Sequence, residues 1–120
     1  MQEEKLWELL TRCLAGDEQE AIKLLEQSPA LLNEPWNGEL VEVAENLRIH
    51  YQMTPLHAAA RGGSEGVLIS LLRRGANLHS LAGGWTALFY AARAGQLDAF
   101  KCAAYWKKVW ESAFIVKMIR

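Results

Sequence analysis

The stretch that decides the fold is TPLHAAARGG, residues 54–63, which is followed 32 positions later by TALFYAARAG, residues 86–95. Both copies begin with a threonine, end in a glycine and carry alanines between them. A repeat with a period between about 20 and 50 residues indicates a solenoid or array in which each unit packs against the next. The spacing therefore predicts similar units stacked side by side.

Each copy predicts a short helix that opens a two-helix unit. Thr54 is a favourable N-cap, Pro55 suits the first helical position, and Gly63 can adopt the left-handed conformation that ends a helix. The next segment, SEGVLISLLRRG, repeats apolar residues every three or four positions, which gives a second helix one apolar face before Gly75. The following ANLHSLAGGW has no helical period and predicts a loop or hairpin leading to Thr86.

These residues together resemble the ankyrin repeat, whose unit of about 33 residues carries a T-P-L-H-x-A signature. The resemblance is strong over residues 54–95 and extends in weaker form over about residues 4–102. It implies an all-α helical repeat, in which each unit has a β-turn finger and two antiparallel helices. It also implies a structural role for His57, because the family's histidine joins neighbouring units by hydrogen bonds.

The second copy departs from this signature, because Ala87 replaces the proline and Phe89 replaces the histidine. Phe89 cannot make the histidine's hydrogen bonds, so we expect this unit to depend on apolar packing. Upstream, residues 4–33 resemble a degenerate first unit with a charged outer side, as a capping repeat needs. We expect one domain over residues 1–120, with units at about 4–33, 54–85 and 86–102 and with helices at about 3–14, 18–27, 55–61, 65–73, 87–93 and 97–118.

An insertion of 20 residues separates Asn33 from Thr54. Its segments 39–43 and 47–51 are rich in strand formers and flank a turn at 44–46. We interpret residues 34–53 as an elongated β-hairpin finger, which either packs over the first helices or reaches a partner. Each strand should have one apolar side, because alternate positions are occupied by Val41, Val43, Leu47, Ile49 and Tyr51.

The end of the chain predicts one long helix over about residues 97–120, since residues 96–120 contain neither glycine nor proline. Its apolar side chains include Trp106, Trp110 and Phe114, and leaving such surface in water costs about 25 cal/mol per Å². We therefore expect these side chains to be covered. Either the helix bends back over the stack as a cap, or a second chain covers it, or the native chain differs from or continues beyond Arg120.

Composition and motifs argue against several functional classes. A net charge of −1, from 13 basic and 14 acidic side chains, creates no overall field for nucleic acid or anionic membranes. The two cysteines and three histidines lack metal-site spacing, and no phosphate loop or nucleophile elbow is present. We expect no catalytic, cofactor or metal site. The acidic start and the short apolar runs predict a cytoplasmic protein without signal peptide or membrane span.

The resemblance implies a non-catalytic module that binds another protein through its fingertips and its concave helix face. Trp85 is the leading contact, because a tryptophan beside Gly83 and Gly84 has little local core to enter and tryptophan is enriched at interface hot spots. The alternative for Trp85 is packing against the neighbouring finger. The full set of expected partner contacts is Trp85, Met53, Tyr51, Arg61, Arg93 and Leu81.

Self-association is the alternative function. In that case the chain is a structural or assembly protein that forms a homodimer through Trp106, Trp110 and Phe114 of the C-terminal helix. A membrane-surface role is disfavoured, because the basic residues of the tail are not gathered on one helical face.

Overall fold

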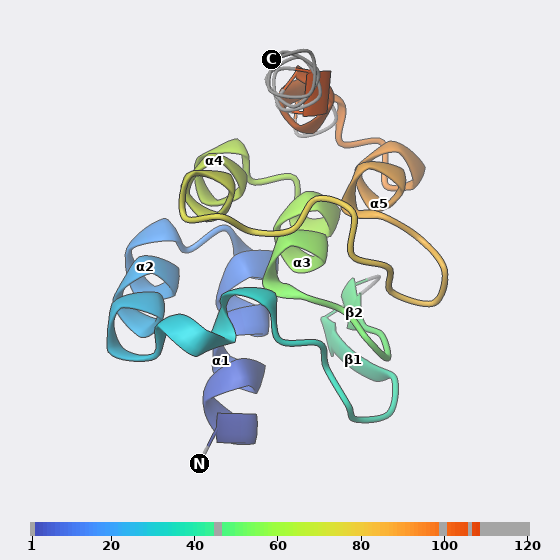
Figure 1. The fold of residues 1–120 in the computed structure, drawn as a ribbon. Coiled ribbons are helices and arrows are strands. Elements are labelled where there is room, and N and C mark those ends of the chain that lie inside the picture. Colours follow the sequence, from blue (N-terminus) through green and yellow to red (C-terminus); the bar gives the residue numbers. More distant parts are fainter. Residues whose placement is uncertain (1, 45–46, 99–100, 106, 109–120) are drawn as a thin grey trace, which may run out of the picture.

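A computed structural model describes residues 2–44, 47–98, 101–105 and 107–108 (Figure 1). Its elements are α1 (Gln2–Ala15), α2 (Glu18–Gln27), the 3₁₀ helix η1 (Pro29–Asn33), β1 (Val41–Ala44), β2 (Leu47–Ile49), α3 (Pro55–Gly62), α4 (Glu65–Arg73) and α5 (Ala87–Arg93). The five helices expected before residue 97 are confirmed, each within one residue of its predicted bounds. Residues 97–98, 101–105 and 107–108 are also helical, whereas positions 109–118 of the expected last helix lie outside the described residues.

The helices form two rows. Figure 1 shows α1, α3 and α5 side by side as one row, with α2 and α4 in a second row on its upper left side, and the contacts of α3 with α1, α5 and α4 agree. The two rows enclose a core of leucines and small residues, in which Ala58, Ala59 and Ala60 of α3 are fully buried. Gly62 extends this close packing, because a Cβ there would collide with the backbone carbonyl of Leu14 in α1.

Local capping explains where the helices begin. The Asp17 carboxylate accepts a hydrogen bond from the Glu20 amide at 3.4 Å, and the Ser64 hydroxyl accepts one from Val67 at 3.3 Å. Such side chains satisfy amides that the first helical turn leaves unpaired. At the other end of α3, Gly63 has a φ of 76°, which is the left-handed conformation expected of it.

Polar side chains also tie successive units together. The Asn33 amide oxygen accepts a hydrogen bond from the Asn77 backbone at 2.8 Å, which joins the end of η1 to the loop after α4. On the second row, Ser70 of α4 donates to the Glu18 carboxylate of α2 at 3.0 Å. These contacts between residues more than forty positions apart hold the units in register.

The insertion is closed at its base by Trp36, which the sequence did not single out. The Trp36 amide donates to the Met53 carbonyl at 2.9 Å, and the Gln52 amide donates to the Trp36 carbonyl at 2.7 Å. The indole Nε1 donates to the carbonyl of Glu39 at 3.1 Å, and the ring packs against that of Trp7 in α1 with centroids 5.3 Å apart. The expected finger is therefore a hairpin fastened to the first unit.

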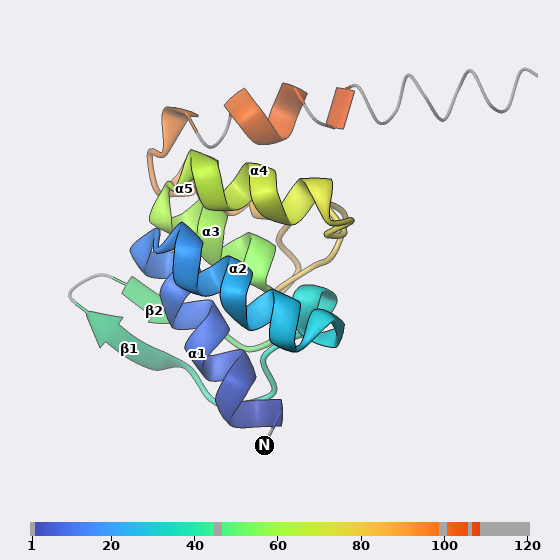
Figure 2. The same cartoon turned by 90° about the vertical axis from the view of Figure 1, so that its left-hand side faces the viewer.

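The hairpin lies against the helix row. Figures 1 and 2 show β1 and β2 on the side of α1 and α3 that faces away from α2 and α4. Ile49 of β2 is fully buried and belongs to the hydrophobic core. Of the two roles expected for the insertion, packing over the first helices is thus confirmed for β2.

The expected apolar side of the hairpin is wrong at two positions, because Val43 and Tyr51 are exposed. Between Glu42 and Ala44 the pairing register shifts, so a β-bulge at Val43 breaks the alternation of side chains. Tyr51 falls in a turn rather than in a strand, since β2 ends at Ile49.

Candidate functional site

A buried histidine connects α3 to the finger of the next unit. His57 lies in the first turn of α3, where its Nδ1 accepts a hydrogen bond from the Thr54 amide at 3.2 Å. Because Nδ1 is an acceptor, Nε2 carries the proton and donates to the carbonyl of Trp85 at 3.0 Å. The structural role expected for His57 is confirmed, and the same bond fixes the backbone at Trp85.

The finger that carries Trp85 ends in a tight turn. Ala82 and Trp85 pair across the turn, and Gly83 and Gly84 between them have φ values of 58° and 86°. Two successive positive φ angles form the hairpin turn that glycine adopts most readily. Leu81, just before this turn, is exposed.

Two aromatic rings form a stack at the end of this finger. The rings of Trp85 and Phe89 have centroids 3.9 Å apart and an interplanar angle of 11°. Both remain in contact with water, with Trp85 45% and Phe89 38% exposed. Phe89, which replaces the histidine of the signature, therefore packs on Trp85 and leaves the core. We call this pair the aromatic stack.

A cavity of about 260 Å³ lies between the hairpin and the helix row. Its lining residues come from β2 and the residue after it, from α3, and from α5 with the residue after it: Arg48, His50, Arg61, Tyr90, Arg93 and Ala94. We call it the arginine cavity. Arg61 and Arg93 occupy equivalent positions in the last turns of α3 and α5, which explains why both reach the same space.

The arginines influence the other groups of this cavity. The pKa of His50 is lowered from its usual value of 6.5 by burial first and then by the charges of Arg48, Arg93 and Arg61. The pKa of the Tyr90 phenol is raised by burial, and the charge of Arg93 opposes this effect. Near neutral pH the cavity therefore holds an uncharged imidazole among three guanidinium groups.

Tyr90 links the cavity to the rest of the site. Its hydroxyl donates to the carbonyl of Ala82 at 3.3 Å, and its ring meets His57 edge-on with centroids 5.3 Å apart. The His50 ring lies 6.1 Å from the Tyr90 ring. Tyr90 is thereby held by the finger, by α3 and by the hairpin.

The expected partner contacts divide into three groups. Tyr51, Leu81 and Trp85 are exposed, and Arg61 and Arg93 line the arginine cavity. Met53 is a correction, because it is 0% exposed and its backbone pairs with Trp36, so the insertion turns it into the core. The tail positions Trp106, Trp110 and Phe114 lie outside the described residues.

Sequence reasoning missed Arg48, His50 and Tyr90 as site residues. Tyr90 occupies the variable position of the signature, where the first copy has the much smaller Ala58, and this difference in size could have indicated that the second unit has a different wall. Arg48 and His50 occupy alternate strand positions, so they share one side of the hairpin. The sequence could not show that Arg48 and His50 face α3 and α5, because no local sequence pattern tells which helices the insertion packs against.

Other kinds of site find little support within the described ranges. No group of three or more histidine, cysteine, aspartate or glutamate side chains there could hold a metal ion. Burial raises the pKa of the Cys13 thiol to about 12, and it also raises the pKa of Cys102, so both thiols stay protonated at neutral pH. None of the helices in this part of the chain is both long and apolar enough to cross a membrane.

Comparison with known proteins reveals similarity to a family of repeats and to a channel subunit. A family model described as ankyrin repeats (3 copies) matches residues 13–104. Among curated proteins, Transient receptor potential cation channel subfamily A member 1 of Homo sapiens is 45% identical over 49 residues. That match covers 41% of this chain and 4% of the channel subunit, so the similarity concerns a small part of a much longer protein.

Proposed function

Because this chain belongs to the ankyrin-repeat family, we propose that it is an interaction module that binds a segment of a partner protein along its hairpin, α3 and α5. Ankyrin repeats are generally protein-interaction modules, and the family is generally non-catalytic. In this proposal the units at about 4–33, 54–85 and 86–102 provide the scaffold, and the insertion 34–53 adds one wall of the binding face.

The aromatic stack is the observation that carries the proposal. Trp85 and Phe89 expose their rings although leaving apolar surface in water is unfavourable by about 25 cal/mol per Å². The rings already lie flat on each other, and His57 donates a hydrogen bond to the Trp85 carbonyl. Binding would therefore cost little conformational entropy at these side chains. Tryptophan is also among the residue types most enriched at interface hot spots.

The stack and the arginine cavity lie along the same helix. Phe89 and Arg93 are four residues apart in α5, so their side chains occupy the same helical face. A bound segment that covers the stack would therefore extend to Arg93 and the cavity. This arrangement supports an extended binding surface with an apolar part and a cationic part.

Two free thiols support a cytoplasmic setting for this module. Cys13 is buried and Cys102 is half-buried, and neither forms a disulfide. Unpaired cysteines are typical of proteins in a reducing compartment.

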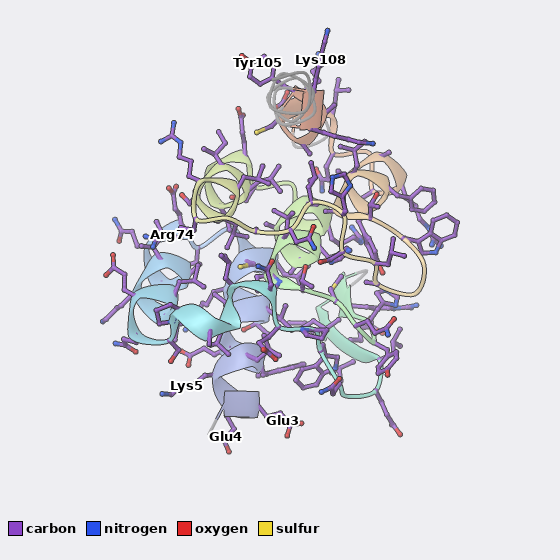
Figure 3. All side chains as sticks on the ribbon, in the orientation of Figure 1. Glu3, Glu4, Lys5, Arg74, Tyr105 and Lys108 are labelled. Atoms are coloured by element: carbon purple, nitrogen blue, oxygen red, sulfur yellow. The ribbon has the colours of Figure 1, made fainter. Side chains whose placement is uncertain are left out.

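The direct test is a binding measurement with matched aromatic variants. Partner proteins captured by the purified chain would be titrated against wild type, Trp85→Ala and Phe89→Ala by calorimetry. Each substitution should weaken binding about tenfold or more, as hot-spot truncation does. Tyr105→Ala is the control, because Tyr105 is also exposed but lies on the C-terminal helix, away from the hairpin (Figure 3). Equal affinities for all four proteins would refute the proposal.

Self-association is the second candidate function, and two exposed apolar residues favour it. Leu97 and Tyr105 are both largely exposed on the helical residues that follow α5. Figure 2 shows this helix at one end of the stack, where a second chain could approach. The sequence places Trp106, Trp110 and Phe114 further along the same segment.

Light scattering coupled to size-exclusion chromatography tests this candidate. If the helix mediates dimerisation, the wild type should have twice the mass of one chain, and the double variant Leu97→Glu with Tyr105→Glu should be monomeric. Unchanged unfolding temperatures would show that the variant is folded. A wild-type protein that remains monomeric at the highest concentration reached would contradict self-association.

A further inference from the structure

The arginine cavity brings positively charged side chains from three elements to one partly open space. Arg48 comes from β2, Arg61 from α3 and Arg93 from α5. Among the described residues, none of those that line the cavity is an aspartate or a glutamate. The remaining walls are the rings of His50 and Tyr90 and the small side chain of Ala94.

Structural roles explain each arginine separately and leave their convergence unexplained. Arg61 and Arg93 occupy last helical turns, where a cation interacts favourably with the helix dipole. Arg48 forms a surface ion pair with Glu42, in which Nε lies 3.9 Å from Oε2, and such exposed pairs contribute little. None of these roles requires the three side chains to border one cavity.

We propose that the arginine cavity binds a phosphoryl group carried by a side chain of the partner protein. This inference rests on the proposed function and names the chemistry of the partner at that site. A phosphorylated residue would occupy the cavity while a neighbouring apolar residue covers the aromatic stack, since Arg93 and Phe89 share one face of α5.

Charge and geometry favour a phosphoryl group over a carboxylate. A phosphorylated side chain carries a charge of about −1.5 to −2 at pH 7 and offers three acceptor oxygens. A carboxylate offers one charge and two oxygens, which a single guanidinium group already satisfies in a bidentate pair. Three arginines that line one cavity from three elements therefore match the phosphoryl group better.

His50 provides an internal reporter of binding. Arg48 from its own strand, Arg61 from α3, and Tyr90 and Arg93 from α5 are its neighbours, and burial first and then the three cations disfavour its protonation in the free protein. A bound dianion would offset those charges. The pKa of His50 should therefore rise on binding, and binding should be accompanied by proton uptake.

The test uses synthetic peptides in which one central residue, flanked by leucine and alanine, is phosphoserine, phosphotyrosine, serine, tyrosine or glutamate. Binding is measured by NMR on the isotope-labelled full chain, with inorganic phosphate as a separate titrant. At least one phosphorylated peptide should bind ten times more tightly than its unphosphorylated and glutamate forms, and should raise the pKa of His50. Affinity should fall as salt is added.

Variants assign the effect to the cavity. Arg93→Gln and Arg48→Gln should each weaken binding of the phosphorylated peptide about tenfold, as expected for loss of a charge-assisted hydrogen bond. Arg73→Gln should leave it unchanged, because Arg73 occupies the matching last turn of α4 and does not line the cavity. Unfolding temperatures of the three variants provide the check on folding.

Three results would overturn the inference. Glutamate peptides that bind as tightly as phosphorylated ones would identify a general acidic site. Inorganic phosphate that binds as tightly as every peptide would identify a site for the free anion. Phosphorylated peptides that bind without shifting the signals of cavity residues, or that do not bind at all, would show that the cavity does not recognise this group. If partner binding nevertheless depends on Trp85, the proposed function stands and this inference alone fails.

Discussion

Replacing Trp36 with alanine should lower the free energy of unfolding by about 4 kcal/mol, within the range seen when large core aromatics are truncated. The side chain is 8% exposed and packs against Trp7 of α1. The substitution also removes the indole hydrogen bond to the Glu39 carbonyl. Because the Trp36 backbone pairs with residues 52 and 53, the base of the hairpin should loosen along with the core.

Urea denaturation followed by circular dichroism measures this loss, and Trp85→Ala is the matched control. Trp85 is half exposed and its ring stacks on that of Phe89, which is itself partly exposed, so its truncation should cost less than about 1 kcal/mol. Limited proteolysis should cut Trp36→Ala within the insertion faster than it cuts either other protein. Equal losses for Trp36→Ala and Trp85→Ala would show that Trp36 does not fasten the insertion.

Helix positions could be predicted from the sequence because their signals are local. Thr86 caps α5 with its hydroxyl, which accepts a hydrogen bond from the Phe89 amide at 3.4 Å. Gly63 and Gly95 follow α3 and α5 and both have positive φ angles. Each of these features depends on residues within a few positions, so the repeated motif specified both helices directly.

The sequence predicted that the hairpin exists, but it predicted the direction of its side chains less well. Strand formers on both sides of a turn identified it, but the alternation of apolar residues assumed regular pairing. The bulge beside Val43 changes which side each residue faces, and bulges leave no reliable trace in composition. Trp36 was the strongest sequence feature that could have indicated how the insertion packs, since a large apolar ring in a polar insertion needs other residues to cover it.

In the candidate site too, features that depend on the local repeat could be predicted, whereas features that depend on tertiary packing could not. Trp85, Arg61 and Arg93 were candidates because the family resemblance implies binding through the fingertips and the concave helix face. Met53 was assigned by the same logic and was wrong, since the insertion before it replaces the ordinary finger and returns Met53 to the core. The arginine cavity requires the packing of β2 against α3 and α5, which only the structure supplies.

His57→Ala should lower the free energy of unfolding by about 3 kcal/mol. His57 is buried and its two ring nitrogens connect Thr54 at the start of α3 to Trp85 in the next finger. Each lost hydrogen bond contributes about 1 kcal/mol, and the vacated space adds the cost of a cavity. His57→Asn should recover part of the loss if its amide reaches Thr54, because the contact within α3 is then kept.

The stability of the wild type should also fall as the pH drops below about 6.5. Burial lowers the pKa of His57 from 6.5, although the hydrogen bonds to the Trp85 and Ser80 carbonyls oppose this shift. A proton on Nδ1 of His57 would face the Thr54 N–H, which is itself a donor. His57 therefore stays neutral in the folded state at pH values where the same side chain already binds a proton in the unfolded chain. The unfolded state therefore gains stability between pH 6.5 and the lower pKa of His57 in the folded protein.

Urea midpoints measured from pH 7.5 to 5.0 should fall for the wild type and fall less for His57→Asn. His50→Asn is the control for the other histidine with a lowered pKa, and it should keep the part of the slope due to His57. A slope that survives unchanged in His57→Asn and disappears in His50→Asn would assign the acid sensitivity to the arginine cavity instead.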